Sequence, residues 1–141
     1  MSSPPTREFR KRTWYIPGVI LVITLGLLSR HYPDFFPSGL GKYPGDVLWA
    51  LMVFLAWGIL LPAAPTFYIC ISTLATSYAV EFLKLYPSPW LEHVRATTIG
   101  HLVFGSVFSW RNLVAYTIGV AIGATVECIL AGHSGKFFKG Q

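Results

Sequence analysis

The chain has 141 residues and a formal net charge of +5, yet 53% of its residues are hydrophobic and only 12% are charged. Soluble domains average about 25% charged residues, so this composition excludes an ordinary water-soluble fold and favours an integral membrane protein. The basic residues line no soluble face, so we predict no nucleic-acid partner.

Residues 1–13 are polar and basic, and we predict that they form a cytoplasmic tail. The apolar run at 14–29 follows with no small-residue cleavage site, which favours a retained membrane anchor over a signal peptide. Trp14 and Tyr15 at one end of this first span and Arg30 at the other should lie at the membrane interfaces and extend it.

Three further membrane spans are predicted at residues 47–64, 66–85 and 113–132. Pro62 and Pro65 bracket a very short turn, so the second and third spans should form an antiparallel hairpin. Asp46 and Ser109 are the predicted N-caps of the second and fourth spans. The membrane domain thus covers 14–132, and a second cytoplasmic tail covers 133–141.

A connector at 86–98 and an apolar segment at 99–110 separate the third span from the fourth. Crossing a hydrocarbon core about 30 Å thick takes about 20 helical residues, so the apolar segment is too short to span. We predict a re-entrant or interfacial helix whose backbone polar groups are covered by protein. The predicted fold class is all-α, an integral membrane four-helix bundle with one short additional helix.

The third span carries polar residues on one side. Thr73, Ser77 and Glu81 follow one another at i, i+4 spacing, and Lys84 comes three residues later. Residues at this spacing share one helix face, and a polar face is costly to expose to lipid. We therefore expect this face to point into the bundle.

The fourth span carries Gly119 and Gly123 in a GxxxG pattern, which predicts close packing with another helix. Glu127 lies near its cytoplasmic end, where we expect it to snorkel or to be hydrogen-bonded, with a proton relay as the alternative. Cys70 and Cys128 lie in apolar runs without ligand spacing, which favours buried free thiols over a disulfide.

An even number of spans places both termini on the same side of the membrane. The positive-inside rule assigns the more basic side to the cytoplasm. We therefore predict that both termini are cytoplasmic, because basic residues precede the first span and follow the last: Arg7, Arg10, Lys11, Arg12, Lys136 and Lys139.

With this topology, five charged residues gather at the outer end of the bundle, where charges commonly mark binding sites or pathways. Arg95 and Arg111 flank the short apolar segment, and a pair of guanidinium groups suits a phosphate or a carboxylate. In the alternative interpretation, the acidic and basic groups satisfy one another and hold that segment in place. The residues concerned are Asp46, Glu81, Lys84, Arg95 and Arg111.

Motifs for catalysis are absent from the sequence: there is no GxSxG, no HExxH and no P-loop. We therefore favour a non-enzymatic role, with no catalytic residue, no metal and no cofactor. His101 is the only histidine within an apolar segment, and no second histidine lies at a matching depth in another span. A hydrogen-bonded core histidine is accordingly favoured over a haem ligand.

The sequence resembles a family of small bacterial membrane proteins known as domain of unknown function 2809, which is distantly VanZ-like. The resemblance covers about residues 18 to 127 and rests on residues 26–30, 43–52, 80–86, 95–100 and 112–119, together with Trp90. It implies four membrane helices with charged motifs on one side. Because the VanZ-like relatives are associated with low-level glycopeptide resistance, it also implies a role at the cell envelope.

Two departures from the family pattern bear on the site. Lys84 stands where the family usually has glutamine, and Asn112 stands where it usually has aspartate. Both changes make the site more positive. They disfavour a mechanism that needs two carboxylates, favour an anionic ligand, and add Asn112 to the candidate ligand-binding residues.

Three functions remain open at this point. The first is binding of an anionic lipid or envelope precursor, with Lys84, Arg95 and Arg111 as phosphate contacts. The second is an accessory subunit of a larger membrane complex, or self-association, through Gly119, Gly123 and the aromatic rims. The third is a small transporter or membrane enzyme that uses Glu81 as a proton carrier. Membrane lipids are expected partners in every case.

Overall fold

The computed structural model describes residues 12–137, with side chains described from residue 14 to residue 131. Within that range the chain forms helices and short irregular connections, without a strand. The predicted tail at residues 1–13 therefore lies almost wholly outside the described residues, as does the end of the predicted tail at 133–141.

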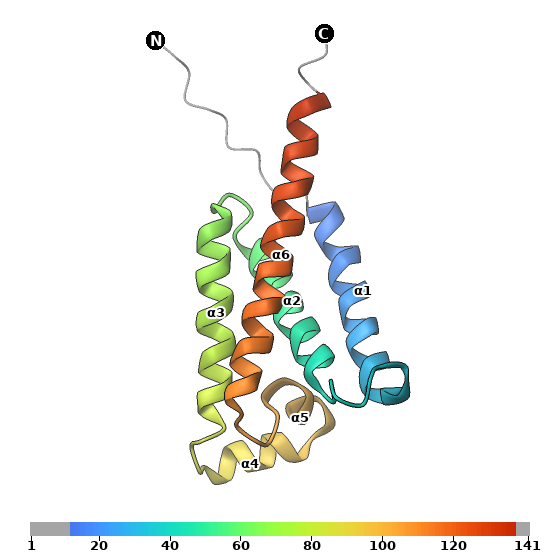
Figure 1. Cartoon of the computed structure of the whole chain (residues 1–141). Coiled ribbons are helices and arrows are strands. Elements are labelled where there is room, and N and C mark those ends of the chain that lie inside the picture. The colour runs from blue at the N-terminus through green and yellow to red at the C-terminus, as the bar shows by residue number, and fades with distance from the viewer. Residues whose placement is uncertain (1–11, 138–141) are drawn as a thin grey trace.

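Four long helices build the molecule: α1 (Arg12–His31), α2 (Tyr43–Leu60), α3 (Thr66–Leu83) and α6 (Trp110–Phe137). Each is long and apolar enough to cross a membrane. Two short helices, α4 (Pro89–Ala96) and α5 (Thr98–Phe104), lie across one end of the bundle, whereas α1 begins and α6 ends at the other (Figure 1). The predicted all-α, four-span architecture is confirmed, and we call these the α4–α5 end and the opposite end.

Several predicted boundaries were wrong by a few residues. α2 begins at Tyr43, so Asp46 lies inside its first turn and is not the N-cap, which is Lys42. Pro44 in that first turn lacks only an N–H that would be unsatisfied there anyway, so the loop proline starts the helix early. A single-turn 3-10 helix, Pro33–Phe35, also interrupts the loop after α1.

The stretch between the third and fourth spans contains more helix than expected. The predicted connector at 86–98 contains α4, which Ser88 precedes and Pro89 begins. The predicted short helix at 99–110 is real but ends at Phe104, because Gly105 takes a left-handed backbone conformation with φ of 62°. α6 begins at Trp110, directly after Ser109 and three residues before the predicted start of the fourth span.

The bundle core lies between α2, α3 and α6. Phe54, Ile69 and Val120, one from each helix, form a buried apolar cluster. Gly119 and Gly123 of α6 face α2 closely: a Cβ added at Gly119 would lie 2.5 Å from the Val47 carbonyl oxygen, and one at Gly123 would lie 2.7 Å from the Phe54 ring. The two glycines thus let the backbones of α2 and α6 approach each other. By contrast, α1 packs mainly on α2.

The polar face of α3 points inward as predicted. The side chains of Thr73, Ser77 and Glu81 are all fully buried. The Thr73 hydroxyl donates to the Ile69 carbonyl oxygen one turn earlier, so it needs no hydrogen-bond acceptor on a neighbouring helix. A carboxylate at Glu81 has no such local solution, and its partners define the first part of the candidate site.

Candidate functional site

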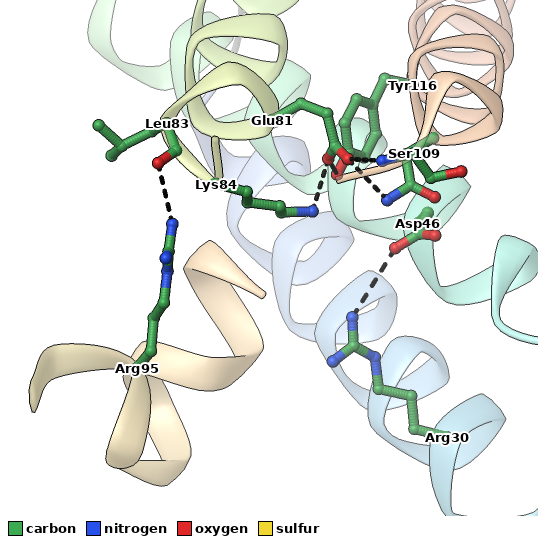
Figure 2. Close-up of polar contacts among 9 residues, drawn as sticks. Arg30, Asp46, Glu81, Leu83, Lys84, Arg95, Ser109 and Tyr116 are labelled. Carbon is green, nitrogen blue, oxygen red and sulfur yellow. Dashed lines mark hydrogen bonds and ion pairs between the residues drawn. The ribbon is translucent and has the colours of Figure 1, made fainter. Parts of the chain in front are cut away.

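A single buried carboxylate organises the α4–α5 end of the bundle. Glu81 is 0% exposed and accepts hydrogen bonds at both oxygens (Figure 2). Its Oε1 accepts from the Ser109 backbone N–H at 2.8 Å and from Asn112 Nδ2 at 3.0 Å. Its Oε2 accepts from the Tyr116 hydroxyl at 2.8 Å and from Lys84 Nζ at 2.5 Å.

Local sequence explains why these donors converge. Asn112 and Tyr116 are four residues apart and so share one face of α6, directly opposite the polar face of α3. Ser109 supplies a backbone N–H at the start of the same helix, where the helix dipole favours a negative charge. Glu81 therefore fastens the first two turns of α6 to the end of α3.

Lys84 completes this cluster from the same helix face as Glu81. Its side chain is only 5% exposed, and its stem passes under Gly105, where an added Cβ would lie 3.0 Å from Lys84 Cε. A buried ammonium is costly without a partner, and Glu81 neutralises it. The Lys84 side chain is thus buried between Glu81 and Gly105.

Arg95 also binds the protein itself. Its Nη2 donates to the Leu83 carbonyl oxygen at 3.0 Å, across from α4 to the end of α3 (Figure 2). This carbonyl oxygen also accepts from the Tyr86 backbone N–H at 3.1 Å, so Arg95 is its second donor at the C-terminal end of α3, where a cationic side chain is favourable. Arg95 therefore attaches α4 to the end of α3 and does not form a common site with Arg111.

Arg111 lies in different surroundings. It is exposed on the first turn of α6, and no described residue forms a hydrogen bond or an ion pair with its guanidinium group. It lines a groove of about 360 Å³ between the start of α2 and α6, and it is the only charged residue there. We call this the α2–α6 groove; its other lining residues are Leu40, Tyr43, Pro44, Val47, Val114, Ala115 and Ile118.

Asp46 is the second buried carboxylate at this end, and it is poorly satisfied. It is 7% exposed, and the nearest opposite charge, Nη2 of Arg30, lies 3.9 Å from its Oδ1 (Figure 2). Its Oδ2 is buried without a hydrogen-bond partner among the described residues. Asn112 Oδ1 is likewise buried and unpartnered, because the amide nitrogen of that side chain faces Glu81.

A second groove, of about 290 Å³, runs between α1, α2 and α5. Arg30 is its only charged lining residue, and we call it the α1–α2–α5 groove. Sequence reasoning did not place Arg30 in the site, although residues 26–30 are among those that carry the family resemblance. The remaining lining residues are apolar or glycine: Val22, Ile23, Gly26, Leu27, Gly45, Leu48, Trp49, Met52, Ile99, Leu102 and Val103.

The opposite end of the bundle has its own polar contacts. Glu127 of α6 accepts from the Tyr15 hydroxyl at 3.0 Å and from the Thr66 hydroxyl at 2.8 Å. These donors come from α1 and α3, so Glu127 joins three helices and is hydrogen-bonded, one of the two arrangements expected for it.

Three other sequence expectations concern possible ligands. His101 is exposed, so the prediction that it lies in the core was wrong. Its side chain lies on the outer side of the short helix α5. Cys70 is half-buried and Cys128 is exposed, so the burial predicted for Cys128 was also wrong. Among the described residues, no group of His, Cys, Asp and Glu could hold a metal ion.

Of the six candidate residues, three meet at Glu81, since Lys84 and Asn112 both bind it. Asp46, Arg95 and Arg111 each have separate surroundings. Tyr116 was missed, although its i, i+4 spacing from Asn112 was a usable signal.

Comparison with known proteins gives a family match that contains the candidate site residues. Residues 35–120, more than half of the chain, match the family model described as "Protein of unknown function (DUF2809)". The match spans the whole Glu81 cluster, Asp46 and Arg111. No solved structure matches the chain.

Proposed function

We propose a ligand for this membrane protein, which belongs to the DUF2809 family of proteins of unknown function. The ligand is an anionic amphiphile, namely a phosphate-bearing lipid or a phosphate-bearing envelope precursor. The apolar part would lie in the α2–α6 groove, and Arg111 would bind the headgroup. The observation that carries this proposal is a lone, unpartnered arginine at the end of an otherwise uncharged groove. A guanidinium group can bind a phosphate through two parallel hydrogen bonds.

The depth of Arg111 supports a headgroup contact. Three aromatic rings, Phe82, Phe108 and Trp110, contact one another beside it, with ring centroids 5.0–6.2 Å apart. Trp110 is 69% exposed, as expected for an aromatic residue at a membrane interface. Arg111 is the next residue, so its guanidinium group would lie among the headgroups while the groove reaches into the apolar layer.

The volume of the α2–α6 groove also suits such a ligand. Small-molecule sites commonly measure about 300–1,000 Å³ and combine apolar walls with a few polar groups. A groove of about 360 Å³ with one charged residue fits part of an acyl or prenyl chain and one headgroup contact. Lys84 and Arg95, the other expected phosphate contacts, are engaged with Glu81 and Leu83, which leaves Arg111 to carry this role.

We further propose that the protein resides in the bacterial inner membrane with both termini cytoplasmic. The basic residues before the first span support this orientation through the positive-inside rule. The α4–α5 end and the α2–α6 groove would then face outward. A phosphate-bearing envelope precursor would be available there, in keeping with the resemblance to VanZ-like proteins.

The alternative functions have less support. Gly119 and Gly123 are already used against α2, so they offer no free surface to an accessory partner or a second copy. Glu81 accepts from four donors and has an ammonium group as one of them, which disfavours its use as a proton carrier.

The proposal is tested by native mass spectrometry of the protein released from bilayers of phosphatidylglycerol and phosphatidylcholine. Wild type should retain phosphatidylglycerol stoichiometrically, and Arg111→Gln should retain it at least about tenfold less, the factor expected from losing one hydrogen bond to a charged group. Val114→Trp, which fills the groove, should have the same effect. Val126→Trp is the matched control, because Val126 is also exposed on α6 but lies outside the groove. Equal retention by wild type and Arg111→Gln would refute the proposal.

A further inference from the structure

The α1–α2–α5 groove differs from the α2–α6 groove in its charge. Both grooves are apolar with a single arginine at the α4–α5 end of the bundle. Arg111 has no acidic neighbour among the described residues, whereas Arg30 faces the Asp46 carboxylate. The charged residue that lines the α2–α6 groove therefore has no ion-pair partner in the described part of the chain, whereas the one that lines the α1–α2–α5 groove has a carboxylate beside it, just outside the groove lining.

The Arg30–Asp46 pair is incomplete as a salt bridge. At 3.9 Å the two groups are beyond hydrogen-bond distance, and Arg30 remains about one-third exposed. Asp46 is more than nine-tenths buried, and its Oδ2 has no donor among the described residues. A buried carboxylate oxygen without a hydrogen bond is costly, so Asp46 has the capacity to accept from a further donor.

Gly45 shapes the contact between the groove and this pair. A Cβ at this position would lie 3.3 Å from Arg30 Nε and 3.4 Å from Ser29 Oγ. Glycine therefore allows the Arg30 side chain to lie across the first turn of α2, next to Asp46. Because Gly45 and Arg30 both line the groove, a chain lying in it ends beside the charged pair.

We propose that the α1–α2–α5 groove is a second lipid site, selective for a phospholipid whose headgroup carries a primary ammonium group beyond the phosphate. Arg30 binds the phosphate, and Asp46 accepts a hydrogen bond from the ammonium N–H. The headgroup is a zwitterion that matches the adjacent opposite charges of the protein. The inference is independent of Arg111 and of the α2–α6 groove.

The charges select this headgroup over two common ones. A quaternary ammonium group, as in phosphatidylcholine, carries no N–H and cannot supply the donor that Asp46 lacks. A phosphatidylglycerol headgroup has hydroxyl donors but no positive charge, so its hydrogen bond to Asp46 would lack the assistance of a charged donor. Phosphatidylethanolamine provides both the donor and the charge, which together form a charge-assisted hydrogen bond.

The test is competitive lipid retention by the full chain, measured by native mass spectrometry from bilayers of equal parts phosphatidylethanolamine and phosphatidylcholine. Wild type should retain phosphatidylethanolamine about tenfold over phosphatidylcholine, the factor expected from one hydrogen bond to a charged group. Asp46→Asn should reduce this preference while it keeps total retention, because an uncharged amide oxygen accepts a weaker hydrogen bond from the ammonium group and Arg30 still binds the phosphate. Arg30→Gln should lower retention of both lipids. No preference in wild type, or an undiminished preference in Asp46→Asn, would overturn the inference.

Two further variants assign the effect to the groove. Ile99→Trp should block the site, because Ile99 is exposed on α5 and lines the groove. Ile71→Trp is the matched control, being exposed on α3 and outside both grooves. Arg111→Gln should leave the phosphatidylethanolamine preference unchanged. If Arg111→Gln removes it instead, the second site is refuted while the α2–α6 groove remains supported. If Arg111→Gln leaves phosphatidylglycerol retention equal to that of wild type while the phosphatidylethanolamine preference persists, the first proposal alone is refuted.

Discussion

Glu81 and Asp46 are two buried carboxylates at the same end of one bundle, yet their surroundings are opposite. Glu81 receives four donors from α3, α6 and the residue before α6. Asp46 has one arginine at 3.9 Å and an oxygen without a partner among the described residues. A charge in a membrane span is therefore not by itself a functional site. A fully satisfied carboxylate holds the fold together, and an incompletely satisfied one has capacity for a ligand.

The largest expected effect tests the structural role of Glu81. Glu81→Ala leaves the buried Lys84 ammonium, the Ser109 N–H and two α6 side chains without their acceptor. We expect a loss of about 3–5 kcal/mol in the free energy of unfolding, as for other broken buried ion pairs. Reversible unfolding in mixed micelles measures it. Glu81→Ala together with Lys84→Met should recover part of the loss, and a change under about 1 kcal/mol in the single variant would contradict this role.

The next effect concerns the contact that brings α2 and α6 together. Gly119→Ala places a Cβ 2.5 Å from a backbone oxygen of α2, so the helices must separate. Overpacking of this kind costs about 1–3 kcal/mol. Gly26→Ala in α1 is the matched control, since its Cβ would have its nearest neighbour at 3.9 Å, an ordinary contact. Thermal unfolding should show Gly26→Ala equal to wild type or more stable, because alanine favours helix; equal behaviour of the two variants would count against close packing at Gly119.

A smaller effect is expected from one donor to Glu81. Tyr116→Phe removes a single interhelical hydrogen bond but leaves the ring packed against Trp49. Such bonds in membrane proteins contribute about 0.6 kcal/mol on average and up to about 1.7. The same unfolding measurement applies. A loss as large as that of Glu81→Ala would show that the tyrosine, and not the carboxylate, dominates the cluster.

The smallest effect on stability is expected at Asp46. Asp46→Asn removes a long ion pair with a partly exposed partner, which is worth about 0–1 kcal/mol. The variant should therefore fold normally while its lipid selectivity changes. Circular dichroism and unfolding curves, compared with those of Glu81→Gln, give the measurement. If Asp46→Asn destabilises the protein as strongly as Glu81→Gln, the contrast between the two carboxylates fails.

Much of the candidate site was within reach of the sequence, and the errors are instructive. Thr73, Ser77 and Glu81 were placed on an inward face because i, i+4 spacing and the cost of polar groups in lipid allow little else. The expected pairing of Arg95 with Arg111 did not form a common site. Arg95 donates instead to the Leu83 carbonyl oxygen at the end of α3, a contact that depends on where α4 lies and not on any spacing along the chain.

Composition and hydrophobic length alone determined that this is a four-span α-helical membrane protein, because lipid admits few other arrangements for so apolar a chain. They also determined which residues carry its charges. Only the tertiary structure decided which charged side chains have hydrogen-bond or ion-pair partners and which do not. That outcome depends on the close approach of α2 and α6 at Gly119, on the turn at Gly105 that brings Ser109 to Glu81, and on the path of α5 beside α1. Hydrogen bonds are short and directional, so distances between helices separate a structural carboxylate from one with room for a ligand.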